Sequence, residues 1–421
     1  MRILHTSDWH LGKSLAGISR QPEQEAFCEE VVELCEEEQI DVVLLTGDVF
    51  DTYNPPIVAE ELFFDTMARL GDGGRRAVVV IAGNHDSPDR LTAAVPLAAR
   101  HGVWILGHPG DVPAAHGIAR EGRVQLLTSG PNHLHFGLPS GEQASVAALP
   151  YPSEARFRRQ LTGTLEEHAR QQAYSAHVGE LLAAPLADAP PEAIRLAASH
   201  LAVRSCMPSE SERVLVGGAY QVDGRHLPAR AQYTALGHLH LPQVIDDAPS
   251  LAAYSGAPLA FRMSEREHER AHRIVTVADA RSPAQVRAVP IAAGRSLVVW
   301  EASSVDEVIT EVEAGAHEGA IIELRLAVDH RLDHASMARL QKLPRSFVRI
   351  RVDLPETRAD TVAPEVRHQL PPAELFQAFH REQTGLDPDP EIVRLFVELL
   401  GGDAPGPRPE PRATVPPRPT P

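Results

Sequence analysis

Basic residues and cysteines are scarce in this sequence. Its 421 residues include 40 Lys and Arg against 57 Asp and Glu, which gives a formal net charge of −17. Proteins that bind polyanions usually carry a basic excess, so the overall charge gives no support for a nucleic-acid partner. The three cysteines include no Cys-x-x-Cys pair. This excludes a disulfide framework and a structural zinc site of that type, and it favours a reducing compartment.

Long apolar runs and a phosphate-binding loop are also missing. No segment approaches the roughly 18 apolar residues of a membrane span, and residues 1–8 lack the apolar stretch of a signal peptide. We therefore expect a cytoplasmic protein with no membrane contact. The sequence contains no Gly-x-x-x-x-Gly-Lys-[Ser/Thr] motif, so any nucleotide hydrolysis must come from another chain.

The first three hundred residues alternate strand-like and helical patterns. Apolar positions at helical spacing predict helices over 24–38 and 58–70, and the Gly-, Pro- and His-rich stretch 107–141 predicts loops or a ragged hairpin. This order is typical of an α/β fold. The remaining predicted elements are a helix over 152–184 and strands over 2–6, 41–46, 77–82, 193–199, 213–216, 233–236, 253–256 and 273–277.

A smaller unit follows the first domain, which we place at residues 1–292. Residues 293–368 show a compact β-α-β-α-β order, and residues 369–402 contain two amphipathic helices. The tail 403–421 contains eight prolines and is predicted to be disordered.

Polar clusters stand directly after five of the apolar strands. The carboxyl ends of strands in an α/β sheet meet at one rim, so these side chains can converge although they lie far apart in sequence. Taken singly, each has a simpler interpretation as a helix cap, a hydrogen-bonded core histidine or a turn. Together they offer enough oxygen and nitrogen ligands for two metal ions. The clusters contain Asp8 and His10, Asp48 and Asp51, Asn84 and His85, His200, and His238 and His240.

The chemistry of these ligands limits which metal ions can bind. Carboxylate, imidazole and amide oxygen without thiolate suit Mn²⁺, Fe²⁺, Zn²⁺ or Mg²⁺. Two such ions about 3.5–4 Å apart can hold a phosphoryl group and lower the pKa of a bound water. Asp48 follows Gly47 in a tight turn, which predicts that its carboxylate bridges the two ions.

The motifs resemble those of the calcineurin-like metallophosphoesterases. They are Asp-x-His at 8–10, Gly-Asp-x-x-Asp at 47–51, Gly-Asn-His-Asp at 83–86, His200, and Gly-His-x-His at 237–240. One branch is more similar still, the SbcD family of nuclease subunits, with agreement in order and spacing over about residues 1–265. The segments that carry this resemblance are 8–13, 47–51, 83–88, 209–213 and 254–258.

The resemblance implies a role for each site residue. His85 would stay free of metal, face the scissile phosphate and act as a general acid. Asp51 would orient His85. Thr52 stands where protein phosphatases usually carry Arg, which counts against a phosphoprotein substrate. One metal would be held by Asp8, His10, Asp48 and His240, and the second by Asp48, Asn84, His200 and His238.

The resemblance also implies an architecture and partners. The fold would be a four-layer α/β/β/α sandwich with a small α/β capping domain and C-terminal helices. The activity would be Mn²⁺-dependent cleavage of double-stranded DNA ends and hairpins in repair and recombination, with an SbcC-type ABC ATPase and as a homodimer within a heterotetramer. The terminal helices would dock that ATPase or pack on their own cap. Their apolar stripes contain Leu375, Phe376, Phe379, Phe396, Leu399 and Leu400.

Two other functions compete with this interpretation. The same motifs would serve a stand-alone phosphoesterase that acts on small phosphodiesters or organic phosphates, although the cap and terminal helices argue against it. A non-catalytic scaffold would need a broken ligand position, and none is broken.

Overall fold

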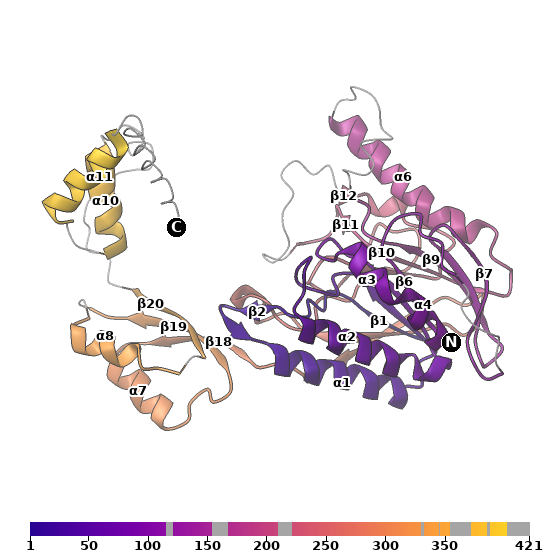
Figure 1. Ribbon diagram of the computed structural model, residues 1–421, viewed down its shortest axis with the longest axis horizontal. Helices are drawn as coiled ribbons and strands as arrows, with labels where there is room; N and C mark the ends of the chain where they lie inside the picture. The colour runs from indigo at the N-terminus through magenta and orange to yellow at the C-terminus, as the bar shows by residue number, and fades with distance from the viewer. Residues whose placement is uncertain are drawn as a thin grey trace, which may run out of the picture. The chain divides into compact units, whose positions relative to one another are not determined.

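The computed structural model describes residues 1–114, 121–153, 167–208, 221–329, 332–344, 346–353, 372–384 and 388–401 (Figure 1). Its first sheet has the strand order β17-β16-β1-β4-β5-β6. Four strands are parallel: β1 (Arg2–Thr6), β4 (Val42–Thr46), β5 (Ala77–Ile81) and β6 (Val103–Leu106). Two antiparallel strands, β16 (Ala271–Thr276) and β17 (Gln285–Pro290), extend the edge beside β1.

The second sheet has the order β14-β15-β13-β10-β9-β8-β7. Its strands β9, β10, β13 and β15 are parallel, whereas β7, β8 and β14 run antiparallel to their neighbours. The bounds are β7 (Gln125–Gly130), β8 (His133–Gly137), β9 (Gln143–Leu149), β10 (Ile194–His200), β13 (Tyr233–Gly237), β14 (Gln243–Val244) and β15 (Ala252–Tyr254).

Helices cover the outer faces of both sheets. Helices α1 (Gln21–Glu37) and α2 (Ile57–Leu70) pack on the first sheet, where Phe27 and Phe63 are fully buried. Helix α6 (Glu167–Ala187) packs on the second sheet. A third core joins the inner faces of the two sheets. The predicted α/β/β/α sandwich is therefore confirmed. Short elements are β2 (Ser14–Leu15), β3 (Ile18–Ser19), α3 (Pro88–Leu91), α4 (Val95–Ala98), β11 (Ala202–Val203) and β12 (Gln221–Val222).

The sequence predicted the buried parallel strands better than the outer ones. Strands β7 and β8 form an antiparallel pair with an irregularity between Leu126 and Thr128, which confirms the ragged hairpin expected within 107–141, whereas β9 and β17 were not predicted. In β7 and β17 most side chains are exposed or half-buried, so the apolar signal is weak. The predicted strand over 213–216 and the first part of the predicted helix over 152–184 lie outside the described residues.

A separate small core follows the sandwich. Strands β18 (Leu297–Ala302), β19 (Ile321–Ala327) and β20 (Phe347–Asp353) form a parallel sheet, connected by α7 (Val305–Glu313) and α8 (His334–Leu340). This is the β-α-β-α-β order expected from the sequence. The contacts divide the chain into compact units 1–353 and 354–421, so the predicted boundary at 292/293 falls inside the first unit.

The second unit contains two described helices, α10 (Pro372–Thr384) and α11 (Pro390–Gly401). Phe376 of α10 stacks on Phe396 of α11, with ring centroids 4.2 Å apart. The side chains of Leu399 and Leu400, and residues 403–421, lie outside what the structure describes. No helix among the described residues is both long and apolar enough to cross a bilayer.

Candidate metal centre

The nine predicted site residues meet at one rim of the sandwich. His200 is the last residue of β10, and the other eight follow β1, β4, β5 and β13. The carboxyl ends of strands from the two sheets meet here, since His200 Nδ1 of β10 lies 2.8 Å from the backbone carbonyl oxygen of Thr46 in β4. Backbone geometry there is unusual, because Asp8, His10, Asp48 and His238 all have positive φ values. Non-glycine residues hold such angles only where the surrounding structure fixes them, and they gather at functional sites.

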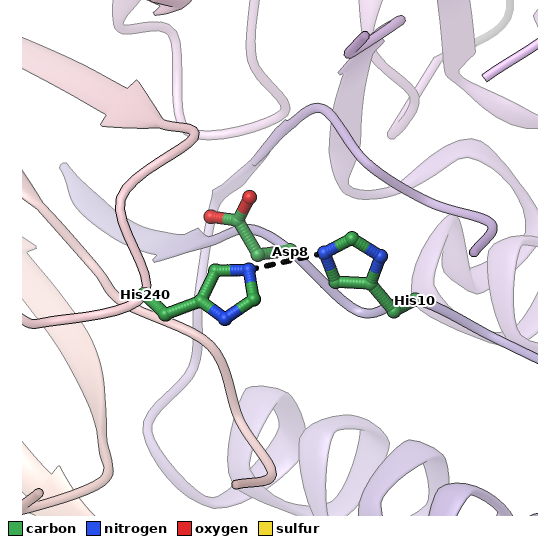
Figure 2. Close-up of side chains that lie close together, drawn as sticks. All are labelled: Asp8, His10 and His240. Atoms are coloured by element: carbon green, nitrogen blue, oxygen red, sulfur yellow. Dashed lines mark hydrogen bonds between the residues drawn. The ribbon is translucent and has the colours of Figure 1, made fainter. Parts of the chain in front are cut away.

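The first half of the centre contains Asp8, His10 and His240. The Nε2 atoms of His10 and His240 lie 3.1 Å apart, and all three side chains are almost fully buried. Figure 2 shows the two rings facing each other with Asp8 beside them. One nitrogen or oxygen from each residue lies within 4.8 Å of the others. These donor atoms can therefore share one cation.

The second half contains Asn84, His200 and His238. The Oδ1 atom of Asn84 lies 3.0 Å from His200 Nε2 and 2.9 Å from His238 Nδ1. The other ring nitrogen of His200, Nδ1, lies 2.8 Å from the backbone carbonyl oxygen of Thr46. That contact fixes the ring, so Nε2 points into the centre.

Asp48 lies between the two halves. Its Oδ2 is 3.7 Å from His10 Nε2, and its Oδ1 is 3.4 Å from His200 Nε2. The main chain makes room for this carboxylate, because a Cβ on Gly83 would lie 2.1 Å from Asp48 Oδ1. Each oxygen thus faces a different group of ligands, as a bridging carboxylate requires.

His85 and Asp51 lie at the more open side of the centre. The His85 side chain is 28% exposed, whereas that of Asp48 is 3% exposed. His85 Nδ1 lies 2.7 Å from the backbone carbonyl oxygen of Asp51. The Asp51 carboxylate instead accepts a hydrogen bond from Lys13 Nζ and lies 3.5 Å from His10 Nδ1. The expected contact with His85 is thus made by the main chain of Asp51.

The pKa values of the two buried aspartates, Asp8 and Asp48, are shifted in opposite directions. Burial raises the pKa of Asp8. Burial also acts to raise the pKa of Asp48, but His200 and His10 outweigh it and hold that pKa well below its usual range. For His200, burial acts to lower the pKa, while the carboxylates of Asp48 and Asp8 raise it to about 9. Asp48 is therefore ionised and ready to bind cations.

Two other ligands are held as neutral imidazoles. Burial lowers the pKa of His10 to about 4 and that of His238 to about 3. Metal ligation needs the neutral ring. The donor set of carboxylates, imidazoles and one amide oxygen, with no thiolate, fits two hard or borderline divalent cations.

Residues behind the ligands were not predicted from the sequence. Glu265 Oε1 lies 3.3 Å from His240 Nδ1, and Glu265 Oε2 accepts the backbone N–H of Phe261. Such a carboxylate orients the ring it contacts. Asp86 accepts three backbone N–H groups, from Val49, Phe50 and Gly83, and so joins the turns after β4 and β5. Asp86 belongs to the Gly-Asn-His-Asp motif, but no pattern marks Glu265, 25 residues after His240.

The comparisons with known proteins agree with this geometry. Residues 1–126 match the calcineurin-like phosphoesterase family, and the sandwich with its His/Asp rim has the fold and dimetal site of that class. The SbcD subunit of the SbcCD nuclease of Bacillus subtilis (strain 168) is 40% identical over 408 residues, covering 96% of this chain and 98% of the relative. The chain belongs to the SbcD family of nuclease subunits.

Two further relatives carry the same name. The SbcD subunit of Rhodobacter capsulatus is 30% identical over 380 residues, covering 86% of this chain and 90% of the relative. The SbcD subunit of Escherichia coli (strain K12) is 25% identical over 410 residues, covering 95% of this chain and 98% of the relative. The similarity thus spans nearly the whole chain, and the protein is a metallophosphoesterase nuclease.

Proposed function

We propose that this nuclease cuts double-stranded DNA ends and hairpins with two Mn²⁺ ions, together with an SbcC-type ATPase. The observation that carries the proposal is the bridging position of Asp48 between two groups of His, Asp and Asn ligands. When bound, the ions would supply an activated water and charge stabilisation at the phosphate. The proposed ligands are Asp8, His10, Asp48 and His240 for one ion, and Asp48, Asn84, His200 and His238 for the other.

His85 is proposed as the general acid of the reaction. Its Nδ1 is held by the Asp51 carbonyl, so Nε2 is the atom available to a substrate, and it lies 4.0 Å from Asp48 Oδ2. The backbone N–H of His85 donates to Asp48 Oδ1 at 2.9 Å, which fixes the residue to the centre. We assign Asp51 a positioning role through its main chain. A proton on His85 Nε2 can pass to the leaving oxygen of a phosphodiester.

The partner is proposed to dock on the paired helices α10 and α11. Phe376 and Phe396 contact each other across the pair, while four large apolar side chains remain 44–57% exposed. Exposed apolar groups on an amphipathic helix pair are typical of an interaction surface. The relatives are named as components of the SbcCD nuclease, which makes an SbcC-type ATPase the expected partner. The exposed residues are Leu375, Phe379, Ile392 and Leu395.

The proposed domains keep the boundaries expected from the sequence. Residues 1–292 would form the nuclease domain, 293–368 the cap and 369–402 the partner-binding helices, while the predicted tail 403–421 lies outside the described residues. A homodimer within a heterotetramer and a cytoplasmic location belong to the same proposal.

A reconstitution experiment tests the function. The chain is purified with and without its SbcC-type partner, and cleavage of a linear duplex and of a hairpin is followed with Mn²⁺ and ATP. We expect hairpin cleavage that needs Mn²⁺ and that the partner with ATP increases. Hydrolysis of small phosphodiesters without DNA cleavage in the complete complex would instead favour the stand-alone phosphoesterase.

A matched pair of variants tests the docking surface. Phe379→Glu and Leu395→Glu place charge on exposed positions, so both chains should fold normally yet bind the partner weakly in a pull-down. Val244→Glu is the control, because Val244 is similarly exposed, at 56%, on the second sheet. Equal partner binding by all three variants would contradict docking through the helices.

A further inference from the structure

A phenylalanine ring packs against both imidazoles of the first ligand group. The Phe261 ring meets them edge to face, with ring centroids 5.1 Å from His10 and 5.7 Å from His240. Phe261 is buried, and its backbone N–H donates to Glu265 Oε2 while Glu265 Oε1 lies 3.3 Å from His240 Nδ1. The segment 261–265 therefore supplies two groups that hold the His240 ring.

Tyr151 occupies the corresponding place in the second ligand group. Its ring stacks on that of His238, with 27° between the planes and 6.4 Å between the centroids. It also meets His200 edge to face, with the centroids 6.1 Å apart. Both arrangements are common between aromatic rings in protein interiors. Each ligand group thus has one aromatic side chain that packs against its two imidazoles.

The main chain fixes Tyr151 at the rim of the sandwich. Tyr151 follows β9, and its backbone N–H donates to the carbonyl oxygen of Ala82 at 2.9 Å, directly before the Gly-Asn-His-Asp motif. The next carbonyl oxygen, that of Pro152, accepts a hydrogen bond from the hydroxyl group of Tyr174 in α6 at 2.7 Å. The segment that carries Tyr151 is therefore tied both to the metal-binding motif and to the helix behind it.

The four imidazoles of the centre differ in what holds their rings. In three of them, one ring nitrogen lies within 3.5 Å of an oxygen atom that is outside the proposed ligand set. His238 differs, because within the described residues its one ring hydrogen bond is the 2.9 Å contact of Nδ1 with Asn84 Oδ1, and Asn84 is itself a proposed ligand. The face of the Tyr151 ring takes the place of that missing oxygen.

A metal ligand binds more tightly when its ring is already in position. An imidazole that rotates freely loses this freedom when it binds an ion, and the loss of entropy weakens binding. A flat aromatic neighbour restricts the rotation beforehand and also shields the site from water. His238 needs such support, because its backbone φ of 104° already lies in a sparsely populated region.

We propose that Tyr151 is a positioning residue for the second metal ion, with Phe261 as its counterpart for the first. The inference rests on the proposed assignment of ligands to two ions and deepens it. Tyr151 would act through the face of its ring on His238 and His200. The hydroxyl group plays no part in this role, so a phenylalanine at position 151 would serve equally well.

Mn²⁺ binding is measured in two backgrounds that each retain one complete ligand group. His240→Gln removes a ligand from the first group, and His238→Gln removes one from the second. Tyr151→Leu or Phe261→Leu is then added to each background, because leucine keeps apolar bulk but offers no flat ring. The paramagnetic resonance signal of free Mn²⁺ during a titration gives the dissociation constant of the remaining ion.

The two rings should affect different ions. In the His240→Gln background, Tyr151→Leu should weaken Mn²⁺ binding by about 10–100-fold, as is typical when a group that supports a metal ligand is changed. Phe261→Leu should leave this affinity unchanged. In the His238→Gln background the two effects should be exchanged. Tyr151→Phe should bind Mn²⁺ as tightly as the parent chain in both backgrounds.

A third aromatic substitution separates metal binding from general stability. Phe136 of β8 is fully buried in the core between the sheets and is outside the metal centre. Phe136→Leu should lower the urea-unfolding midpoint of the metal-free chain and leave both Mn²⁺ affinities unchanged. A loss of affinity in Phe136→Leu that matches the loss in Tyr151→Leu would show that the effect follows stability, and this would overturn the positioning role.

The remaining outcomes separate the positioning role from the function. Unchanged affinity in Tyr151→Leu, or an equal loss in Tyr151→Phe, overturns the role of the ring. Equal losses from Tyr151→Leu and Phe261→Leu in both backgrounds overturn the assignment of one ring to each ion. If neither background binds Mn²⁺, the ligand assignment fails and the inference fails with it. Wild-type chain that shows the expected Mn²⁺ binding but cuts no DNA with its partner overturns the proposed function and leaves the positioning role supported.

Discussion

His85 Nδ1 lies 2.7 Å from the backbone carbonyl oxygen of Asp51, whereas the Asp51 carboxylate contacts Lys13. A carbonyl oxygen only accepts, so His85 donates its Nδ1 proton to it. The neutral ring then has its lone pair on Nε2, and the protonated ring has a transferable proton there. The main chain thus sets the direction in which His85 can give a proton.

Substitution of His85 should separate catalysis from metal binding. His85→Gln removes the acid but leaves every proposed ligand in place, so we expect both metal ions to remain and DNA cleavage to fall by about 10²–10⁴-fold. Metal content is measured by elemental analysis and cleavage under single-turnover conditions. His108→Gln, at a half-buried histidine outside the site, is the control. A rate within about threefold of wild type would exclude a general-acid role.

The main-chain contact of Asp51 leads to a specific expectation for a double variant. Asp51→Asn keeps the carbonyl that holds His85 and changes only the contacts to Lys13 and His10. Its loss of cleavage should therefore combine roughly multiplicatively with that of His85→Gln, as for independent sites. A double variant no slower than His85→Gln alone would show that the two residues act as one unit, with the carboxylate orienting the ring.

The position of Asp48 predicts the loss of both ions from one substitution. Asp48→Asn keeps the shape and one acceptor oxygen but removes the charge between the two ligand groups, so we expect metal content and cleavage to fall together. Asp111→Asn is a suitable control, because Asp111 also accepts backbone N–H groups, from Gly107 and His108, outside the centre. Two tightly bound ions in Asp48→Asn would mean that another group bridges them.

The sequence predicted the candidate ligands at the rim of the site better than the groups that hold these side chains in place. Asp8, Asp48 and Asn84 directly follow buried parallel strands or the short turns after them, and the ends of such strands converge by topology. The groups that hold the side chains in place do so through long-range contacts, which no local sequence pattern indicates. Glu265 reaches His240 from a separate turn, and the contact of Asp51 with His85 uses a carbonyl, which is the same for every residue type.

The sheet of β18, β19 and β20 illustrates the same limit on a larger scale. Arg325 and Arg351 are 26 positions apart in sequence, and only the register of β19 and β20 makes them neighbours. A bulge beside Glu323 shifts that register, and no residue pattern predicted it. In the sequence, Arg262, Arg266 and Arg270 form a short basic run, and such a run is more often a solvated face than a binding surface. Only the fold brings its charge opposite the sheet.

A buried ion pair at the start of α1 predicts a pH-dependent stability. Glu23 of α1 accepts hydrogen bonds from Arg20 Nη2 at 2.7 Å and from the backbone N–H of Arg295 at 2.7 Å, and both Arg20 and Glu23 are buried. Burial acts to raise the pKa of Glu23, but Arg20 and Arg295 outweigh it and hold that pKa below its ordinary value of 4.5. The ionised carboxylate therefore stabilises the fold above about pH 4.5, and this contribution is lost as the pH falls through the lowered pKa.

Glu23→Gln should accordingly be most harmful at neutral pH. It leaves the Arg20 guanidinium buried without its counter-charge, which costs about 3–5 kcal/mol in comparable buried pairs. We expect a lower urea-unfolding midpoint at pH 7, and the difference from wild type should shrink as the pH falls from about 5 to 3. Glu29→Gln is the matched control. Glu29 lies on the exposed face of α1 and pairs with Arg69 of α2, and such surface pairs contribute little to stability. A midpoint difference that stays constant from pH 7 to 3 would show that Glu23 acts through packing and hydrogen bonds, with no contribution from its charge.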